Sequence, residues 1–181
     1  MKRPAVKLTI SIVVIVILLA SVSFFALRWL YPRQYSPLVQ KYADQYGIDR
    51  NLVYAIIKCE SNFDEKARSS AGAFGLMQIT EATYEWARTR ENDKLTQPVS
   101  LYDPEHNIHY GCAIYSILEN EFSHPSVALA AYNAGRGRVI SWLSSDAYSD
   151  DGKTLHTIPF SETDGYVKKV LKTQKIYNLI Y

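Results

Sequence analysis

The stretch IIKCESNFDEKARSSAGAFGLMQIT, residues 56–80, decides how the rest of the chain is interpreted. It begins as an apolar run with helical spacing and reaches a carboxylate at Glu60. A string of Ser, Ala and Gly at 69–75 follows, of the kind found where backbone passes close to another group. The stretch therefore predicts a helix that ends on a carboxylate beside a tightly packed loop.

Glu60 lies on the apolar stripe of this helix. Val53, Ile56 and Ile57 fall at positions i, i+3 and i+4, and Glu60 follows at i+7. Burial of an ionised carboxylate is costly, so such a group tends to keep its proton and to have a raised pKa. No Lys or Arg lies one turn away on the stripe. Alternatively, Glu60 caps the helix end and reaches solvent from the edge of the core.

Four stretches follow one another in a recognisable order: Glu60-Ser61, SSAGAFGLMQIT (69–80), AYNAG (131–135) and IPFSETDGYV (158–167). In this order they resemble the motifs of the lytic transglycosylase catalytic domain, whose core fold is similar to goose-type lysozyme. The resemblance covers about residues 36–181. It implies a mostly α, compact lysozyme-like helical domain that acts on the glycan strands of peptidoglycan.

The resemblance implies that Glu60 is the single catalytic acid and base. Its substrate would be the β-1,4 bond between N-acetylmuramic acid and N-acetylglucosamine, and the product a 1,6-anhydromuramoyl sugar. The 6-hydroxyl of the same sugar is the acceptor, so no second carboxylate is needed to activate water. The substrate's N-acetyl group would stabilise the developing charge. The resemblance implies no cofactor and no metal.

Further residues match substrate-binding positions of the family. Tyr166 matches a tyrosine that orients the catalytic carboxylate, and Glu162, four residues earlier on the same helix face, matches an acidic residue of the groove. Ser69 matches a serine that bonds near Glu60 and the acetamido group. The other expected contacts, in the sugar subsites and the apolar wall behind the acid, are Met77, Gln78, Tyr132 and Asn133. Packing, turn or helix-end roles stay open for Ser69, Tyr132, Asn133, Glu162 and Tyr166.

One departure from the family concerns the residues after Gln78-Ile79. Many relatives carry Met-Pro there, whereas this chain has Thr80-Glu81. Thr80 is expected to cap the next helix. A substrate contact made by a methionine in those relatives is therefore in doubt here.

Residues 1–32 differ in composition from the rest. An uncharged apolar run, LTISIVVIVILLASVSFFAL, extends over 8–27 and follows several basic residues. At about 1.5 Å per residue it spans roughly the 30 Å of a bilayer core. The basic end should stay in the cytoplasm, which predicts a single-pass anchor in the cytoplasmic membrane with residues 33–181 outside. A cleaved signal peptide is the alternative, since Ser21 and Ser23 are spaced like a processing site.

Residues 33–181 are enough for one domain. They carry 16 Lys and Arg against 18 Asp and Glu, which excludes the strong positive excess of a nucleic-acid-binding protein. Four lysines spaced along the last predicted helix are interpreted as a solvated face: Lys168, Lys169, Lys172 and Lys175. No feature of the sequence indicates a protein partner.

The domain is expected to be helical from end to end. The predicted helices are about 37–46, 50–61, 81–90, 104–122, 126–133, 136–143 and 163–179. Ser36, Asp49, Thr80 and Asp103 are expected to cap helices, and Gly47 to end one. The irregular stretch 144–160 is expected to form a short hairpin or a mobile flap.

Other reactive side chains support weaker hypotheses. A disulfide between Cys59 and Cys112 is permitted on the oxidising side of a membrane but is not required. His106 and His109 are interpreted as surface histidines, since no further ligand cluster accompanies them. A hydrolase that uses Asp64 or Glu162 to activate water is one rival function. A wall-binding protein without activity is another.

Overall fold

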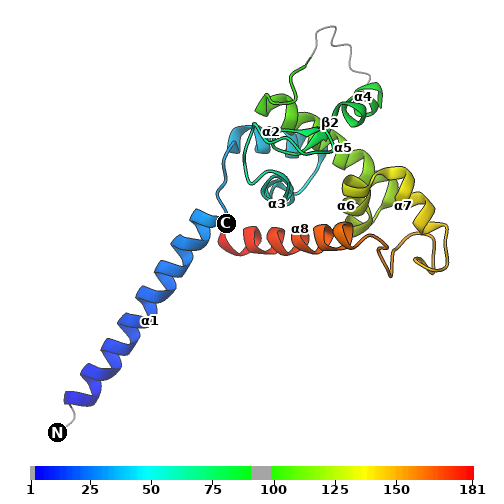
Figure 1. The fold of residues 1–181 in the computed structure, drawn as a ribbon. Coiled ribbons are helices and arrows are strands. Elements are labelled where there is room, and N and C mark those ends of the chain that lie inside the picture. The colour runs from blue at the N-terminus through cyan, green and yellow to red at the C-terminus, as the bar shows by residue number, and fades with distance from the viewer. Residues whose placement is uncertain (1–2, 91–98) are drawn as a thin grey trace.

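The computed structural model describes residues 3–90 and 99–181 as one long N-terminal helix and a helical body (Figure 1). Helix α1 stands apart from the other helices, which pack against one another, and a two-stranded sheet lies against α4 and α5. The mostly helical fold class expected from the sequence is confirmed. The elements are α1 (Arg3–Leu30), α2 (Ser36–Tyr46), α3 (Arg50–Glu60), β1 (Ala73–Phe74), β2 (Ile79–Thr80), α4 (Glu81–Arg90), α5 (Pro104–Phe122), α6 (Pro125–Ala134), α7 (Arg136–Leu143) and α8 (Ser161–Ile180).

Helix α3 lies in the middle of the body because most of its surface is apolar. Residues 52–57 are all buried, and the helix packs against α8 and α2. The Asp49 carboxylate caps the first turn by accepting a hydrogen bond from the Leu52 backbone N–H at 2.8 Å. The helix therefore has a fixed start, and its last residue is Glu60.

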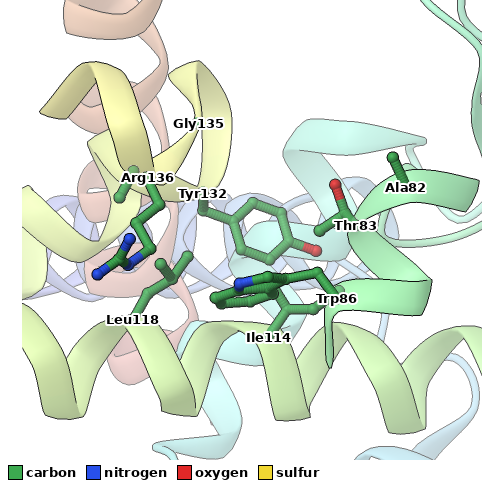
Figure 2. Close-up of a pocket in the computed structure, with 9 residues that line it drawn as sticks. Ala82, Thr83, Trp86, Ile114, Leu118, Tyr132, Gly135 and Arg136 are labelled. Carbon is green, nitrogen blue, oxygen red and sulfur yellow. The ribbon is translucent and has the colours of Figure 1, made fainter. Parts of the chain in front are cut away.

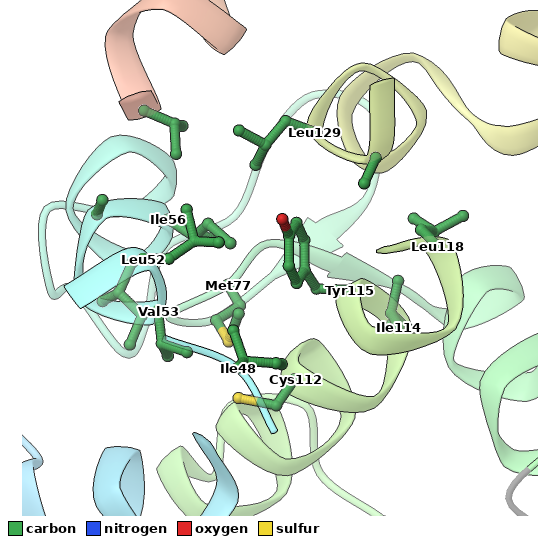
Figure 3. Close-up of a cluster of buried hydrophobic side chains, with 14 of the residues drawn as sticks. Ile48, Leu52, Val53, Ile56, Met77, Cys112, Ile114, Tyr115, Leu118 and Leu129 are labelled. Carbon is green, nitrogen blue, oxygen red and sulfur yellow. The ribbon is translucent and has the colours of Figure 1, made fainter. Parts of the chain in front are cut away.

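Helix α5 supplies the opposite wall of the core. Side chains from α3 and α5 converge on Met77, as Figure 3 shows. Gly111 of α5 makes this approach possible, because a Cβ at that position would lie 2.3 Å from the Met77 sulfur. Any larger residue at 111 would displace Met77 and the loop that carries it.

The sheet is a feature that the sequence did not predict. Strands β1 and β2 are antiparallel, with Ala73 opposite Thr80 and Phe74 opposite Ile79. Each strand has two residues, which is too short for an alternating pattern to be recognised. The string of small residues is thus the entry to a hairpin whose turn carries Leu76, Met77 and Gln78.

Asn107 of α5 holds this hairpin in place from inside the core. Its amide oxygen accepts a hydrogen bond from the Met77 N–H at 2.7 Å, and its amide nitrogen donates to the carbonyls of Phe74 and Leu101 at 2.8 and 2.7 Å. The side chain is fully buried. Gly75 packs directly against it, since a Cβ there would lie 2.5 Å from the Asn107 amide nitrogen.

Replacing Asn107 by Ala is expected to destabilise the body by about 3 kcal/mol or more. The change leaves one buried N–H and two buried carbonyls without their partner, and each such loss costs roughly 1–3 kcal/mol. Urea denaturation of the two proteins measures the difference. Asn120→Ala is the matched control, because Asn120 is an exposed residue of the same helix whose amide only reaches Ser116. Equal stability of the two variants would contradict this role.

One sequence expectation outside the hairpin is wrong, and one of the two forms expected for residues 144–160 is excluded. Ser36 does not cap α2: Tyr35 is the residue before the helix, in the left-handed conformation with φ 56°, and its hydroxyl is tied to Glu65 at 3.1 Å. The chain therefore enters the helix one residue earlier. The segment 144–160 forms turns rather than a hairpin, because the Asp151 carboxylate accepts hydrogen bonds from the N–H groups of Lys153 and Thr154.

The caps expected at the other helices agree with the structure. Asp103 accepts a hydrogen bond from the His106 N–H at 3.1 Å, and Thr80 accepts one from the Thr83 N–H at 3.2 Å. Gly47 ends α2 in the left-handed conformation with φ 68°. These caps depend only on neighbouring residues in the sequence.

Helix α1 is joined to the C-terminal end of α8 by direct contacts. The Tyr177 hydroxyl donates to the Pro32 carbonyl at 2.9 Å, and the Tyr181 hydroxyl donates to the Tyr31 carbonyl at 3.1 Å. The guanidinium groups of Arg28 and Arg33 lie over the Tyr181 ring, 4.2 and 4.0 Å from its centre. The first residues after α1 are therefore attached to the body.

Candidate active site

Glu60 lies at the C-terminal end of α3, where the helix meets the hairpin and α8. The next residue, Ser61, joins these parts: its hydroxyl donates to the Leu76 carbonyl at 2.9 Å and accepts from the Phe63 N–H at 3.1 Å. Phe63 is held at φ 68°, an unusual value for a residue with a side chain. The backbone thus turns sharply just after the carboxylate.

The surroundings of Glu60 favour its neutral form. Burial raises the pKa of the Glu60 carboxyl to about 7, while the Tyr166 hydroxyl and, to a smaller extent, the Lys169 ammonium oppose the rise. The negative end of the α3 dipole lies at the same place and further disfavours a carboxylate. Glu60 makes no ion pair with any residue of the described ranges 3–90 and 99–181. The raised pKa predicted from the sequence is therefore present.

Tyr166 of α8 faces this carboxyl. Burial raises the pKa of the Tyr166 hydroxyl well above its ordinary value, so the group stays protonated and can donate. The hydroxyl oxygen is buried and has no hydrogen-bond partner of ordinary geometry among the described residues, although it is close enough to lower the pKa of Glu60. Hydrogen bonds at catalytic groups are often loose in the unliganded state and tighten with substrate.

Ser69 and Gln78 shape the loop beside Glu60. The Ser69 hydroxyl accepts a hydrogen bond from the Ala73 N–H at 3.0 Å and keeps a proton to donate. The Gln78 amide donates to the Gly75 carbonyl at 2.9 Å and, more weakly, to the Ala67 carbonyl at 3.3 Å. Gln78 has φ 49°, a backbone strain of the kind that accumulates at functional sites.

Tyr132 of α6 completes the wall on the other side of the hairpin. Its hydroxyl donates to the Met77 carbonyl at 2.8 Å. Burial and the nearby Glu60 carboxyl raise the pKa of the Tyr132 hydroxyl well above its ordinary value. The Met77 side chain itself is fully buried against Gly111, so it lies behind the site and not on its surface.

Asn133 and Glu162 lie further along α6 and α8. The Asn133 amide oxygen accepts a hydrogen bond from the Thr163 hydroxyl at 2.8 Å, which ties the end of α6 to the start of α8. Glu162 is exposed in the first turn of α8, one turn before Tyr166. The structure thus brings Glu60, Tyr132 and Tyr166 together and leaves Glu162 at the rim.

Two cavities adjoin these residues. One, of about 240 Å³, lies between α4, α5 and α6, and the rings of Trp86 and Tyr132 face it together with Arg136 (Figure 2). The other, of about 440 Å³, contains Glu60 and lies between the end of α3 and the middle of α8. Tyr132 lines the first cavity and is near Glu60 of the second.

The sequence did not indicate Asn107, Trp86 or Lys169 as parts of the site. A signal existed for two of them. Asn107 is a polar residue on an apolar stripe of α5, and Lys169 lies three residues after Tyr166, on the same helix face. Trp86 gave no such signal, because its approach to Tyr132 depends on the packing of α4 on α5.

The other reactive side chains named from the sequence lie elsewhere. Cys59 and Cys112 are free thiols in the structure. His109 stacks on the Tyr42 ring at 4.7 Å, and within the described ranges no group of three potential metal ligands occurs. Asp64 is exposed and accepts a hydrogen bond from the Lys66 N–H at 2.9 Å in a turn.

Comparison with known proteins now identifies the family. The profile of the transglycosylase SLT domain matches residues 37–155. The chain belongs to this family. The soluble lytic murein transglycosylase of Escherichia coli K12 is 36% identical over 150 residues, which are 81% of this chain and 23% of that protein. The membrane-bound lytic murein transglycosylase C of Photorhabdus laumondii is 35% identical over 167 residues, or 80% of this chain and 47% of that protein.

Solved structures of the family have the same fold. A lytic transglycosylase of Pseudomonas aeruginosa superposes with a TM-score of 0.72 at 34% identity over 82% of this chain and 24% of its own. The 70-kDa soluble lytic transglycosylase in complex with bulgecin A gives 0.75 at 34% identity over 84% of this chain and 25% of its own. The lysozyme-like transglycosylase fold expected from the motifs is therefore confirmed. This chain spans about a quarter to a half of the relatives it matches.

Replacing Glu60 by Gln is expected to stabilise the fold at pH 8 but not at pH 5. The pKa of the Glu60 carboxyl rises from 4.5 to about 7 on folding, so stability is lost as the pH rises from about 4.5 through 7. Above pH 7 the loss of folding free energy caused by Glu60 approaches about 3 kcal/mol. Gln has no charge to bury, so the Glu60→Gln variant avoids this loss. Urea denaturation at the two pH values measures it. Glu81→Gln, an exposed change in α4, serves as control, and a loss of stability in Glu60→Gln at pH 8 would contradict the argument.

Proposed function

We propose that this chain is a peptidoglycan lytic transglycosylase. It would cleave the β-1,4 bond between N-acetylmuramic acid and N-acetylglucosamine and leave a 1,6-anhydromuramoyl product. The observation that carries the proposal is the half-buried carboxyl of Glu60, which has a pKa of about 7 and lines a cavity of about 440 Å³. The relatives named lytic murein transglycosylases support the same reaction.

In the first step Glu60 acts as a general acid. A carboxyl with a pKa of about 7 is about half protonated at pH 7, and the protonated form gives its proton to the glycosidic oxygen as the bond breaks. Tyr166 supports this step as a positioning residue, because its protonated hydroxyl faces the carboxyl and donates to it once it is ionised. The solved Pseudomonas aeruginosa relative is an inactive variant in which one glutamate is replaced by glutamine.

In the second step the Glu60 carboxylate acts as a base. It takes the proton of the 6-hydroxyl on the same muramoyl sugar, and this oxygen attacks the anomeric carbon. Attack within one sugar has a high effective concentration, so one carboxyl is enough. In agreement, Glu60 is the only carboxyl among the described residues that line its cavity.

The other predicted site residues would hold the glycan. The proton that Ser69 keeps is available to the acetamido carbonyl, which stabilises the developing positive charge. Tyr132 and Trp86 offer aromatic faces to a neighbouring sugar in the cavity of Figure 2. Gln78, Asn133 and Glu162 are proposed as polar contacts of the sugar subsites, and Met77 as support behind the acid.

A hydrolase of goose-lysozyme type is the alternative. It requires a second carboxylate to activate water. Its candidates, Asp64 and Glu162, are both exposed, and Asp64 already accepts a backbone hydrogen bond in its turn. A wall-binding protein without activity is a further alternative, and it would not need a carboxyl with a raised pKa.

Digestion of purified peptidoglycan is expected to release 1,6-anhydromuramoyl fragments, each one water lighter than the hydrolytic product. Glu60→Gln should lower kcat by about a thousandfold because the proton donor is lost. Mass spectrometry of the fragments and rates of sacculus digestion measure the two effects. Asp64→Asn is the control and should retain activity within about threefold. Fragments that carry only reducing ends would contradict the transglycosylase reaction and support the hydrolase.

We also propose that α1 anchors the chain in the cytoplasmic membrane, with residues 33–181 on the outer side. The segment Ile10–Leu30 has 21 residues and a mean hydropathy of 2.9. None of it is buried inside the structure. At about 1.5 Å per residue it matches the roughly 30 Å of a bilayer core. A relative named as membrane-bound supports an association with a membrane.

The full chain is expected to remain in the membrane pellet after an alkaline carbonate wash, since an apolar helix of this length inserts stably. Its intact mass after extraction should be that of the whole 20.6 kDa chain. Protease added outside spheroplasts should digest residues 33–181. A soluble species that begins just after Ser21 or Ser23 would instead indicate a cleaved signal peptide.

A further inference from the structure

One face of α8 is turned away from the body. Val167, Val170 and Tyr177 are buried on the side where α3 and α6 pack. The exposed residues on the opposite side follow helical spacing at i, i+4, i+7 and i+11. They are Lys168, Lys172, Lys175 and Leu179, and we call them the lysine face.

The charge of the lysine face is only partly balanced by the protein. Lys168 pairs with Asp164 at 2.6 Å, whereas Lys172 and Lys175 make no ion pair in the described part of the chain. Two ammonium groups on one exposed stripe therefore remain available to an anion outside the protein.

The neighbouring Lys169 is not part of this face. It donates to the Cys59 carbonyl at 3.4 Å and lines the cavity of Glu60 together with Lys58 of α3. Lys172 borders both the face and the cavity. The lysines of α8 thus divide into one that lies beside the candidate site and three that point away from the body.

The end of the lysine face lies at the level where α1 would leave a bilayer. The last turns of α8 are bonded to Tyr31 and Pro32, which directly follow the apolar segment Ile10–Leu30. With this segment across the hydrocarbon core, these bonds place the end of α8 at the outer surface of the bilayer. Leu179 is 79% exposed at this level, and an apolar side chain there gains by entering the headgroup region.

The rest of the face is directed toward the same side. In Figure 1, α8 forms the lower edge of the body, and α1 descends from that edge. Trp29, which is 80% exposed, lies at this junction, and the Arg28 guanidinium lies over the Tyr181 ring, 4.2 Å from its centre. Aromatic and basic residues at the end of a span are typical of the boundary between lipid and water.

We propose that the lysine face lies on the outer surface of the membrane and binds the anionic headgroups of its phospholipids. The inference rests on the proposed anchoring by α1. A bilayer is the occupant that the structure favours, because α1 already brings one next to α8. Each lysine close to an anionic bilayer strengthens the attachment by roughly fivefold.

This contact would fix the orientation of the catalytic body. One helix across a bilayer can tilt, and a body attached to its end tilts with it. A second contact along α8 prevents this motion. Since α3 packs on the inner side of α8, the cavity of Glu60 would then keep one angle to the membrane plane.

The first test measures how lipid shields individual lysines. The full chain is reconstituted into vesicles of phosphatidylcholine, with or without one third of the anionic lipid phosphatidylglycerol, and acetylated with a neutral reagent. Peptide mass mapping gives the rate at each lysine. Lys172 and Lys175 are expected to react about fivefold more slowly in the anionic vesicles, and salt should reduce this difference. Lys41 and Lys153, which lie outside α8, should react equally in both. Equal rates at Lys172 and Lys175 would overturn the proposal.

The second test compares two double variants of equal charge. Lys172→Gln with Lys175→Gln is expected to weaken binding of phosphatidylglycerol to the full chain in neutral detergent by roughly tenfold, as measured by native mass spectrometry. Lys41→Gln with Lys153→Gln is the matched control and should bind like the parent. Circular dichroism verifies that both variants are folded. If both bind like the parent, the lysine face is not the lipid site.

Flotation of the vesicles separates failure of this contact from failure of the anchor. A chain that floats with neither kind of vesicle refutes the anchoring and the lipid contact together. A chain that floats with both, with its lysines unshielded, refutes the contact alone. A soluble acidic polysaccharide tests a wall polymer as the anion: if it shields Lys172 and Lys175 and phosphatidylglycerol does not, the face binds the wall and the proposal is wrong.

Discussion

The chemistry of the candidate site depends on one half-buried carboxyl, Glu60, which lies at the end of a buried helix and makes no ion pair with the described residues. A carboxyl in water loses its proton well below neutral pH, whereas burial makes the charged form of Glu60 costly and raises its pKa to about 7. The position at the end of α3 adds the negative end of the helix dipole. An ion pair would remove this effect, and Lys169 stays outside pairing distance of Glu60 while it donates to the carbonyl of Cys59.

The core around α3 and α5 makes this environment rigid. Asn107 fixes the hairpin from one side, and Gly75 and Gly111 allow the backbone and Met77 to approach it closely. Tyr132 then bonds to the same turn from α6. Because these contacts are buried and specific, the site is built on packed helices and not on a free loop, which favours a fixed geometry at the reacting group.

The sequence was sufficient where structure depends on neighbouring residues. The helices and the caps at Asp49 and Asp103 follow from local patterns, and the periodicity of α3 placed Glu60 on the buried face. The hairpin was not predictable in this way, because its short strands are held by Asn107, about thirty residues away.

The same limit applies to the site. Periodicity placed Glu60 on the apolar stripe but left a capping role open, and its expected catalytic role and the other predicted contacts came from a resemblance to a family. Lys58 and Lys169 acquire their common surroundings only when α3 packs on α8. A local pattern can also mislead, as at Ser36, which is the first residue of α2 and does not cap it.

The junction between α1 and α8 bears on how such an enzyme would search for its substrate. Pro32 and Tyr31 are bonded to the last turns of α8, and Tyr31 also lines the cavity of Glu60, so no loose tether separates the apolar helix from the site. With α1 across a bilayer, the carboxyl would stay at one height above the lipid. Movement of the protein in the plane of the membrane then becomes a two-dimensional scan, restricted to the layer of wall closest to the cell.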